Sequence, residues 1–156
     1  MRIENILVPT DFSENAQVAF TTAFNLAKQL EAKLFVLHVQ DESTLRIALK
    51  EGLVEAASSD EELQTKIHQL IEMRFSSMLA GCDETDVPIE YLHRHGDPKS
   101  EIVEYAGEIR ADMIVIGMRG VSAVTELIRT LLGSVTESVL RKSPCPTLVV
   151  RLDHEA

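Results

Sequence analysis

The sequence predicts a single α/β domain built on a parallel sheet, and three observations support this fold class. Short apolar segments alternate with amphipathic segments of helical period along the chain. The apolar segments are nearly continuous, as in parallel strands that helices cover on both faces. The 156 residues are 45% hydrophobic, which is enough for one packed core. We therefore expect one domain over residues 1–156, with a doubly wound, three-layer, Rossmann-like arrangement and right-handed crossovers.

The first two predicted strands each precede a helical segment. Residues 3–8 form the first strand, and Ser13 is a suitable N-cap for the helix that follows. The apolar residues of that helix recur at steps of three and one as far as Leu30, which gives it one buried face. Residues 33–39 form the second strand, and its apolar character predicts burial on both faces.

The middle of the chain is predicted to be mainly helical. Residues 43–82 have helical character, with a break at 57–60, where Asp60 can cap a second segment. Residues 88–93 form the third strand, which is shorter and more polar than the first two. We therefore expect the third strand to lie close to an edge of the sheet.

The last part of the chain contains two more predicted strands. Asp97 as N-cap and Pro98 at the first helical position are a good start for a helix. Residues 113–116 form the fourth strand and residues 134–141 a helix. Residues 147–151 form the fifth strand and end the fold.

Composition restricts the classes of function. The formal net charge is −10, which disfavours a nucleic-acid backbone as a partner but still allows one nucleotide on local donors. No apolar run approaches the roughly 18 residues that a membrane span needs, and the N-terminus has no signal-peptide pattern. Cys82 and Cys145 form no CxxC or metal-type pattern and fit a reducing compartment. We therefore expect a cytoplasmic protein that binds neither nucleic acid nor membrane.

The richest candidate site follows the fourth predicted strand. The loop reads Gly117-Met118-Arg119-Gly120, and Gly133-Ser134 opens the next helix after a twelve-residue stretch. Ligands of open α/β sheets bind outside the carboxyl ends of the strands, where the strand order reverses. Glycines let backbone N–H groups approach an anion, and a helix N-terminus favours phosphate. An alternative remains open, because Ser134 and Glu137 have the spacing of a capping box, so Ser134 can simply cap its own helix.

Four further residues each have more than one interpretation. Asp11 either accepts hydrogen bonds from a ribose hydroxyl, or binds a metal, or is a turn carboxylate that caps the next helix. Arg119 either pairs with phosphate or is a solvated loop arginine. His93 and His95 share a face of a strand, which permits metal binding, but no third ligand is evident and we predict no metal site.

Taken together, several segments resemble universal stress proteins, and the resemblance runs from residue 3 to about residue 151. The segments that carry it are 8–13, 38–39, 111–117, 133–139 and 143–150. The resemblance implies a five-stranded parallel sheet of order 3-2-1-4-5, in which strands one and four meet at the switch point. It also implies a homodimer formed along the fifth strand, residues 147–151.

The resemblance implies an adenine-nucleotide site as well. The positions that match the surroundings of the adenine, the ribose and the floor of the site are Pro9, Thr10, Asp11, Val39, Ile116 and Gly117. Those that match the ribose and phosphate region are Gly120, Gly133, Ser134, Val135 and Thr136. Val39 would form an apolar wall for the base, or is a core valine. The family's nucleotide-binding members have nine residues between the second and third glycines, whereas residues 121–132 make twelve here and can form a short amphipathic helix.

Three functions follow from these observations. The first is a dimeric stress-response regulator that binds ATP, with or without Mg²⁺. The second is a dimeric protein-interaction module of the same family that binds no nucleotide. The third is an enzyme such as a nucleotide hydrolase or adenylyl transferase. The loop offers no obvious nucleophile–base pair and no GxxxxGK[ST] motif, so we expect at most weak ATP hydrolysis.

Overall fold

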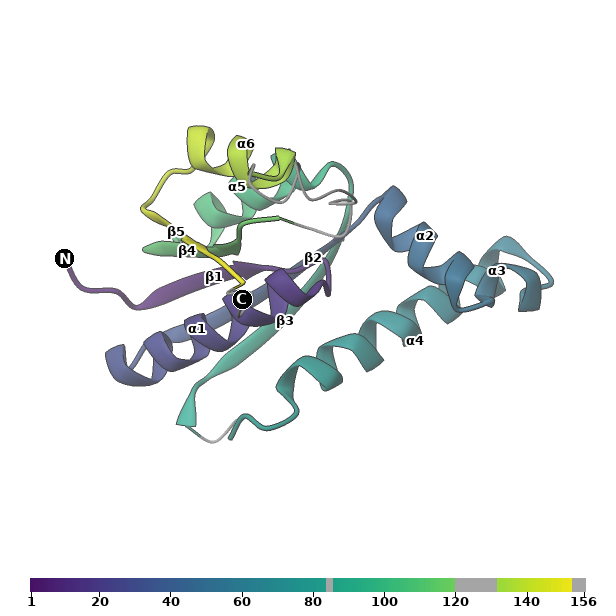
Figure 1. Cartoon of the computed structure of the whole chain (residues 1–156), viewed down its shortest axis with the longest axis horizontal. Coiled ribbons are helices and arrows are strands. Elements are labelled where there is room, and N and C mark those ends of the chain that lie inside the picture. Colours follow the sequence, from purple (N-terminus) through teal and green to yellow (C-terminus); the bar gives the residue numbers. More distant parts are fainter. Residues whose placement is uncertain (84–85, 120–131, 153–156) are drawn as a thin grey trace.

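The computed structural model describes residues 1–83, 86–119 and 132–152. Within these residues, five strands form one parallel sheet of order β3-β2-β1-β4-β5 (Figure 1). The strands are β1 (Asn5–Pro9), β2 (Lys33–Gln40), β3 (Ile89–His95), β4 (Met113–Gly117) and β5 (Thr147–Val150). The predicted fold class and strand order are confirmed. The chain passes from β1 outward to β2 and β3 and then returns to β4, so β1 and β4 flank the switch point.

Helices cover both faces of the sheet. They are α1 (Glu14–Leu30), α2 (Glu42–Lys50), α3 (Leu53–Ala56), α4 (Asp60–Leu79), α5 (Pro98–Glu108) and α6 (Ser134–Lys142). Helices α1 and α4 pack on one face and α5 and α6 on the other, while α2 and α3 extend beyond the end of the sheet (Figure 1). In the described part of the chain, no helix combines the length and the apolar character that crossing a bilayer requires.

The alternation of side chains along each strand explains why the apolar segments are continuous. In β1, Ile6 and Val8 are buried in the same cluster as Phe20 of α1. Leu7, between them, is buried in the second cluster with Ile102 of α5. Each large aliphatic side chain buried in this way contributes about 1.5–3 kcal/mol to folding. A polar residue in such a strand would lose this energy on one face or the other.

Two helices begin where the sequence predicts. The Ser13 hydroxyl accepts a hydrogen bond from the Ala16 N–H at 3.2 Å and caps α1. The Asp97 carboxylate accepts from the Lys99 N–H at 3.3 Å, and Pro98 is the first residue of α5. Proline fits there because the first N–H groups of a helix have no partner within it. Both caps place a helix start at the carboxyl end of the sheet.

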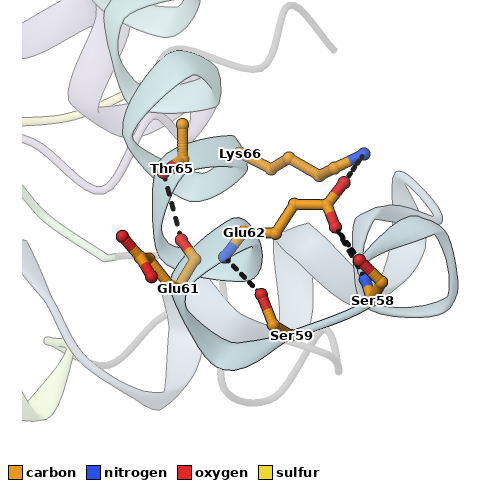
Figure 2. Close-up of polar contacts among 6 residues, drawn as sticks. All are labelled: Ser58, Ser59, Glu61, Glu62, Thr65 and Lys66. Carbon is orange, nitrogen blue, oxygen red and sulfur yellow. Dashed lines mark hydrogen bonds and ion pairs between the residues drawn. The ribbon is translucent and has the colours of Figure 1, made fainter.

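The start of α4 differs from the prediction, because Ser59 rather than Asp60 is its N-cap. The Ser59 hydroxyl accepts from the Glu62 N–H at 3.1 Å (Figure 2). The Glu62 carboxylate turns back and accepts from the backbone N–H of Ser58 at 2.9 Å and from its hydroxyl. Lys66, one turn later, lies 3.5 Å from the same carboxylate. Asp60 is the first helical residue instead, where a negative charge is favourable.

The helical region has one more break than the sequence predicts. Gly52, with a φ of 71°, separates α2 from α3 in a left-handed conformation that suits glycine. The break before α4 lies where the sequence predicts it, and α4 ends at Leu79. Strand β3 reaches His95, two residues beyond the prediction, and it lies at an edge of the sheet as expected.

Candidate functional site

An open cavity of about 280 Å³ lies at the carboxyl end of the sheet, at the switch point of β1 and β4. Eleven of the twelve predicted site residues line it: Pro9, Thr10, Asp11, Val39, Ile116, Gly117, Arg119, Gly133, Ser134, Val135 and Thr136. The twelfth, Gly120, and the segment 121–131 lie outside the described residues, so the predicted short helix there stays a prediction. Residues from four loops and strand ends, far apart in the sequence, therefore meet around one cavity.

Seven further residues of the cavity were not predicted: Ala16, Leu37, Asp41, Glu42, Arg46, Pro98 and Ile102. Most of them belong to the starts of helices that follow β2 and β3. In a parallel sheet each such helix begins at the carboxyl edge, so the first turns of α2 and α5 were reasonable candidates. For Arg46, the sequence contained only a weak indication, which is its spacing of four residues from Glu42. In the structure the Arg46 Nη2 lies 3.8 Å from the Glu42 Oε2.

Gly117 forms the floor of the cavity because no side chain fits there. A Cβ at this position would lie 2.8 Å from the carbonyl oxygen of Asn15 in the first turn of α1. The Gly117 carbonyl in turn accepts a hydrogen bond from the buried Thr136 hydroxyl at 2.8 Å. The Gly133 N–H donates to the Met118 carbonyl at 2.9 Å. Together these contacts bring the starts of α1 and α6 close to the end of β4.

Arg119 is buried in the wall of this cavity. Arg119 is only 8% exposed, so the interpretation of this residue as a solvated loop arginine is wrong. Its Nε and Nη1 atoms are buried and have no hydrogen-bond partner among the described residues. A buried cation whose N–H groups are unsatisfied is costly, whereas an anion that accepts from them forms strong charge-assisted bonds. Arg119 therefore supplies the cavity with donors suited to an anion.

The start of α6 adds backbone donors to the same wall. Gly133 is its N-cap and makes no side-chain hydrogen bond there. Ser134 is the first helical residue, so the capping-box interpretation, in which Ser134 caps the helix, is wrong. The first N–H groups of a helix lack partners within it and carry a partial positive charge. Gly133, Ser134 and Arg119 thus make one side of the cavity favourable for an anion.

The lining of the cavity also contains acidic side chains. Asp11, Asp41 and Glu42 line it from the loop after β1 and from the start of α2. The Asp11 Oδ1 accepts from the Ser13 N–H at 3.0 Å, so this carboxylate closes a turn before α1 and also faces the cavity. Apolar residues line the cavity as well, among them Val39, which is 5% exposed and also part of the core. The cavity suits a molecule that carries both hydroxyl or amino donors and an anionic group.

His93 and His95 lie outside this cavity. Their ring centroids are 4.9 Å apart on β3, as the shared strand face predicts. Among the described residues, no group of three or more histidine, cysteine, aspartate or glutamate side chains is arranged to hold a metal ion.

The fold and the site together define a Rossmann-like α/β protein with an open cavity at its switch point. The sequence model of the universal stress protein family matches residues 2–151. Universal stress protein MJ0531 of Methanocaldococcus jannaschii is 35% identical over 150 residues, which cover 95% of this chain and 82% of the relative. Universal stress protein YxiE of Bacillus subtilis is 31% identical, with 94% of this chain and 97% of the relative covered. The chain belongs to the universal stress protein family.

Solved structures of the family have the same fold. The structure of hypothetical protein MJ0577 superposes with a TM-score of 0.77 at 28% identity, over 99% of this chain and 100% of that one. A universal stress protein in complex with cAMP has a TM-score of 0.59 at 23% identity, over 97% and 98% of the two chains. A universal stress protein from Archaeoglobus fulgidus in complex with dAMP has a TM-score of 0.61 at 21% identity, over 96% and 98%. At these lower identities the last two show a shared fold.

Proposed function

We propose that this chain is a regulatory protein of the stress response that binds an adenine nucleotide, with ATP as the expected ligand. The observation that carries the proposal is Arg119, a buried arginine with unsatisfied N–H groups, in the same wall as the start of α6. A phosphate group would accept from both at once, as anions commonly do at helix N-termini.

The remainder of the cavity suits a nucleoside. Leu37, Val39 and Ile102 offer apolar surface for a base. Asp11 can accept from ribose hydroxyls across the cavity. The choice of adenine rests on the relatives, since two structures of the same fold are complexes with cAMP and dAMP. We expect Mg²⁺ to arrive with the phosphates of ATP.

We propose binding rather than catalysis as the main activity. The described residues of the cavity include no histidine, cysteine or lysine, and its candidate general bases are the carboxylates of Asp11, Asp41 and Glu42, of which Asp11 already accepts from the Ser13 N–H. Weak hydrolysis of bound ATP is compatible with this composition. We also propose a cytoplasmic location, on the cysteine usage of the sequence.

The test is calorimetric titration of the nucleotide-stripped protein with ATP and Mg²⁺. We expect micromolar binding, weakened about tenfold or more in Arg119→Gln, because hydrogen bonds to charged groups contribute about 1.5–3 kcal/mol. Arg141→Gln is the matched control, since Arg141 is exposed at the far end of α6 and bonded to Glu137. Absence of binding to the parent would contradict the proposed function. Equal affinity of Arg119→Gln and the parent would contradict the role of Arg119.

A second property that we propose is a homodimer formed along β5. This strand lies at the edge of the sheet and pairs with β4 alone among the described strands. Leu148 on β5 and Leu140 on the adjacent α6 are 39% and 41% exposed. An exposed edge strand with apolar neighbours is a natural surface for pairing with another chain. If the protein binds no nucleotide, a dimeric interaction module is the function that this surface supports.

A further inference from the structure

The loop between β1 and α1 has a strained backbone next to the cavity. Phe12 has a φ of 62°, in the left-handed region that an aromatic residue rarely adopts. Two tight turns surround it, because the Phe12 N–H donates to the Thr10 hydroxyl and the Ser13 N–H donates to Asp11, both at 3.0 Å. Strained backbone persists only where neighbouring contacts hold it. Thr10 and Asp11 line the cavity, so the strain lies directly in its wall.

His38 holds this loop from the side away from the cavity. Side chains alternate along β2, so Leu37 and Val39 face the cavity whereas His38 points to the opposite face. The His38 Nδ1 lies 2.8 Å from the Thr10 carbonyl oxygen, and it carries the proton because a carbonyl can only accept. In the neutral ring, Nε2 then accepts from the Thr44 hydroxyl at 2.9 Å. Burial lowers the pKa of His38, which favours this neutral form.

The same ring therefore connects two walls of the cavity. Thr10, His38 and Thr44 are 6%, 1% and 2% exposed, so both hydrogen bonds are shielded from water. Thr10 belongs to the β1–α1 loop. Thr44 belongs to α2, which contributes Glu42 and Arg46 to another part of the cavity wall. A shift of the His38 ring would move both walls, although the ring itself does not line the cavity.

Aromatic packing reinforces the hydrogen bonds. The Phe12 and His38 rings have centroids 4.6 Å apart. On its other side, Phe12 meets the ring of Phe75 of α4 edge-on at 5.2 Å. The side chain of the strained residue is thus clamped between β2 and α4. Such clamping offsets the cost of a left-handed backbone at Phe12.

We propose that His38 is a positioning residue of the cavity: by holding the Thr10 carbonyl and the Thr44 hydroxyl, it fixes the β1–α1 loop and the start of α2 in the shape that binds a ligand. The part of the inference that concerns affinity rests on the nucleotide-binding function proposed above. The part that concerns the shape of the loop holds without any ligand.

The test compares two substitutions that each keep a different end of the ring. In His38→Asn the side-chain amide nitrogen lies close to the place of Nδ1 and can still donate to Thr10. In His38→Gln the amide lies close to the place of Nε2, which retains the contact with Thr44 and loses the one with Thr10. Both variants lose the ring, and Asn is one methylene shorter than Gln, so packing alone would favour His38→Gln. The readouts are affinity for Mg²⁺–ATP by calorimetry and, without nucleotide, hydrogen exchange of the Phe12 and Ser13 amides.

We expect His38→Asn to bind within about threefold of the parent and His38→Gln to bind about tenfold more weakly, the usual effect of one lost buried hydrogen bond. The Phe12 and Ser13 amides should exchange faster in His38→Gln than in His38→Asn. Equal affinities and equal exchange in the two variants would overturn the proposal and leave His38 as a packing residue. If the parent binds no nucleotide, the proposed function fails, and the exchange comparison alone decides whether His38 positions the loop.

A second pair of variants serves if neither His38 variant folds. Thr44→Val keeps the shape of the side chain but removes the hydroxyl that His38 contacts, whereas Thr44→Ser keeps the hydroxyl. We expect weaker binding and faster exchange of the Phe12 and Ser13 amides in Thr44→Val than in Thr44→Ser. Identical behaviour of the two would contradict a role for the His38–Thr44 bond.

Discussion

At Gly117, the absence of a side chain allows the first turn of α1 to approach the end of β4 closely. A Cβ there would approach the Asn15 carbonyl oxygen to 2.8 Å, and backbone atoms cannot yield as a flexible side chain would. We expect Gly117→Ala to lower the free energy of unfolding by about 1–3 kcal/mol, the range typical of overpacking. The measurement is urea unfolding followed by circular dichroism.

Gly107 provides a matched control for this substitution. It lies within α5, and a Cβ there would meet no atom within 4 Å. Gly107→Ala should therefore leave stability unchanged or raise it by up to about 1 kcal/mol, because alanine is the better helix former. If both variants were equally stable, the close approach of α1 to β4 would not constrain position 117.

The residues of the site could be predicted from sequence more readily than their contacts. The glycines and the residues at strand ends were identifiable because carboxyl ends of parallel strands meet at one edge. The burial of Arg119 was not, since a loop arginine next to glycines looks the same in sequence whether it points into a cavity or into water. The capping role assigned to Ser134 failed for a similar reason. The S-x-x-E spacing is present, but the backbone places Gly133 at the N-cap position.

At the scale of elements, the strands and the helices packed on them were predictable because the pattern of apolar residues along the sequence indicates both. A short, continuous apolar segment has to be covered on both faces, and β1 and β2 are. The region from α2 to α4 was harder. Its residues are helical in character throughout, and the break at Gly52 depends on a single left-handed residue. The contribution of α2 to the cavity wall follows from where that helix begins, which the pattern of apolar residues does not show.

The contact between β2, β3 and α4 contains three histidines, and the fold lowers the pKa of two of them, His38 and His93. His93 of β3 lies opposite His38 in the sheet, and their ring centroids are 5.9 Å apart. His68 of α4 lies 6.1 Å from His93. Burial, and then repulsion from His38, His95 and His68, lowers the pKa of His93 to about 4.

The sign of the effect on stability follows from this shift. The unfolded chain binds a proton at His93 near its ordinary pKa of 6.5, whereas the folded chain binds it only near 4. Between these values the unfolded state holds more protons, so the free energy of unfolding falls as the pH falls from 6.5 to 4. We expect thermal unfolding measured from pH 7 to 4 to show a smaller loss of stability in His93→Gln than in the parent. His95→Gln removes one of the smaller causes of the shift and leaves burial, the largest, so its loss of stability should lie closer to that of the parent than to that of His93→Gln. Parallel curves for all three proteins would contradict the assignment to His93.

For the whole molecule, the net charge of −10 means that an anionic ligand is repelled at long range. Binding then depends on a few local donors, and the structure concentrates them on the side of the cavity formed by Arg119 and the start of α6. The acidic residues Asp41 and Glu42 follow β2, which β1 separates from β4 in the sheet. This separation favours one orientation of a nucleotide, with its phosphates toward α6. Composition disfavours nucleic acid as a partner, but it could not locate these donors.

Assembly is the property of the whole molecule that we propose for the edge strand β5. We expect the parent protein to be a dimer in light scattering coupled to gel filtration, and Leu148→Glu to be a monomer. Leu148 lies on β5, and a carboxylate buried between two edge strands would lose its hydration without gaining a partner. Met73→Glu is the matched control, because Met73 is also an exposed apolar residue, 66% exposed, but belongs to α4. A dimeric Leu148→Glu variant would place the interface elsewhere, and a monomeric parent would show that the apolar surface at β5 serves another partner or none.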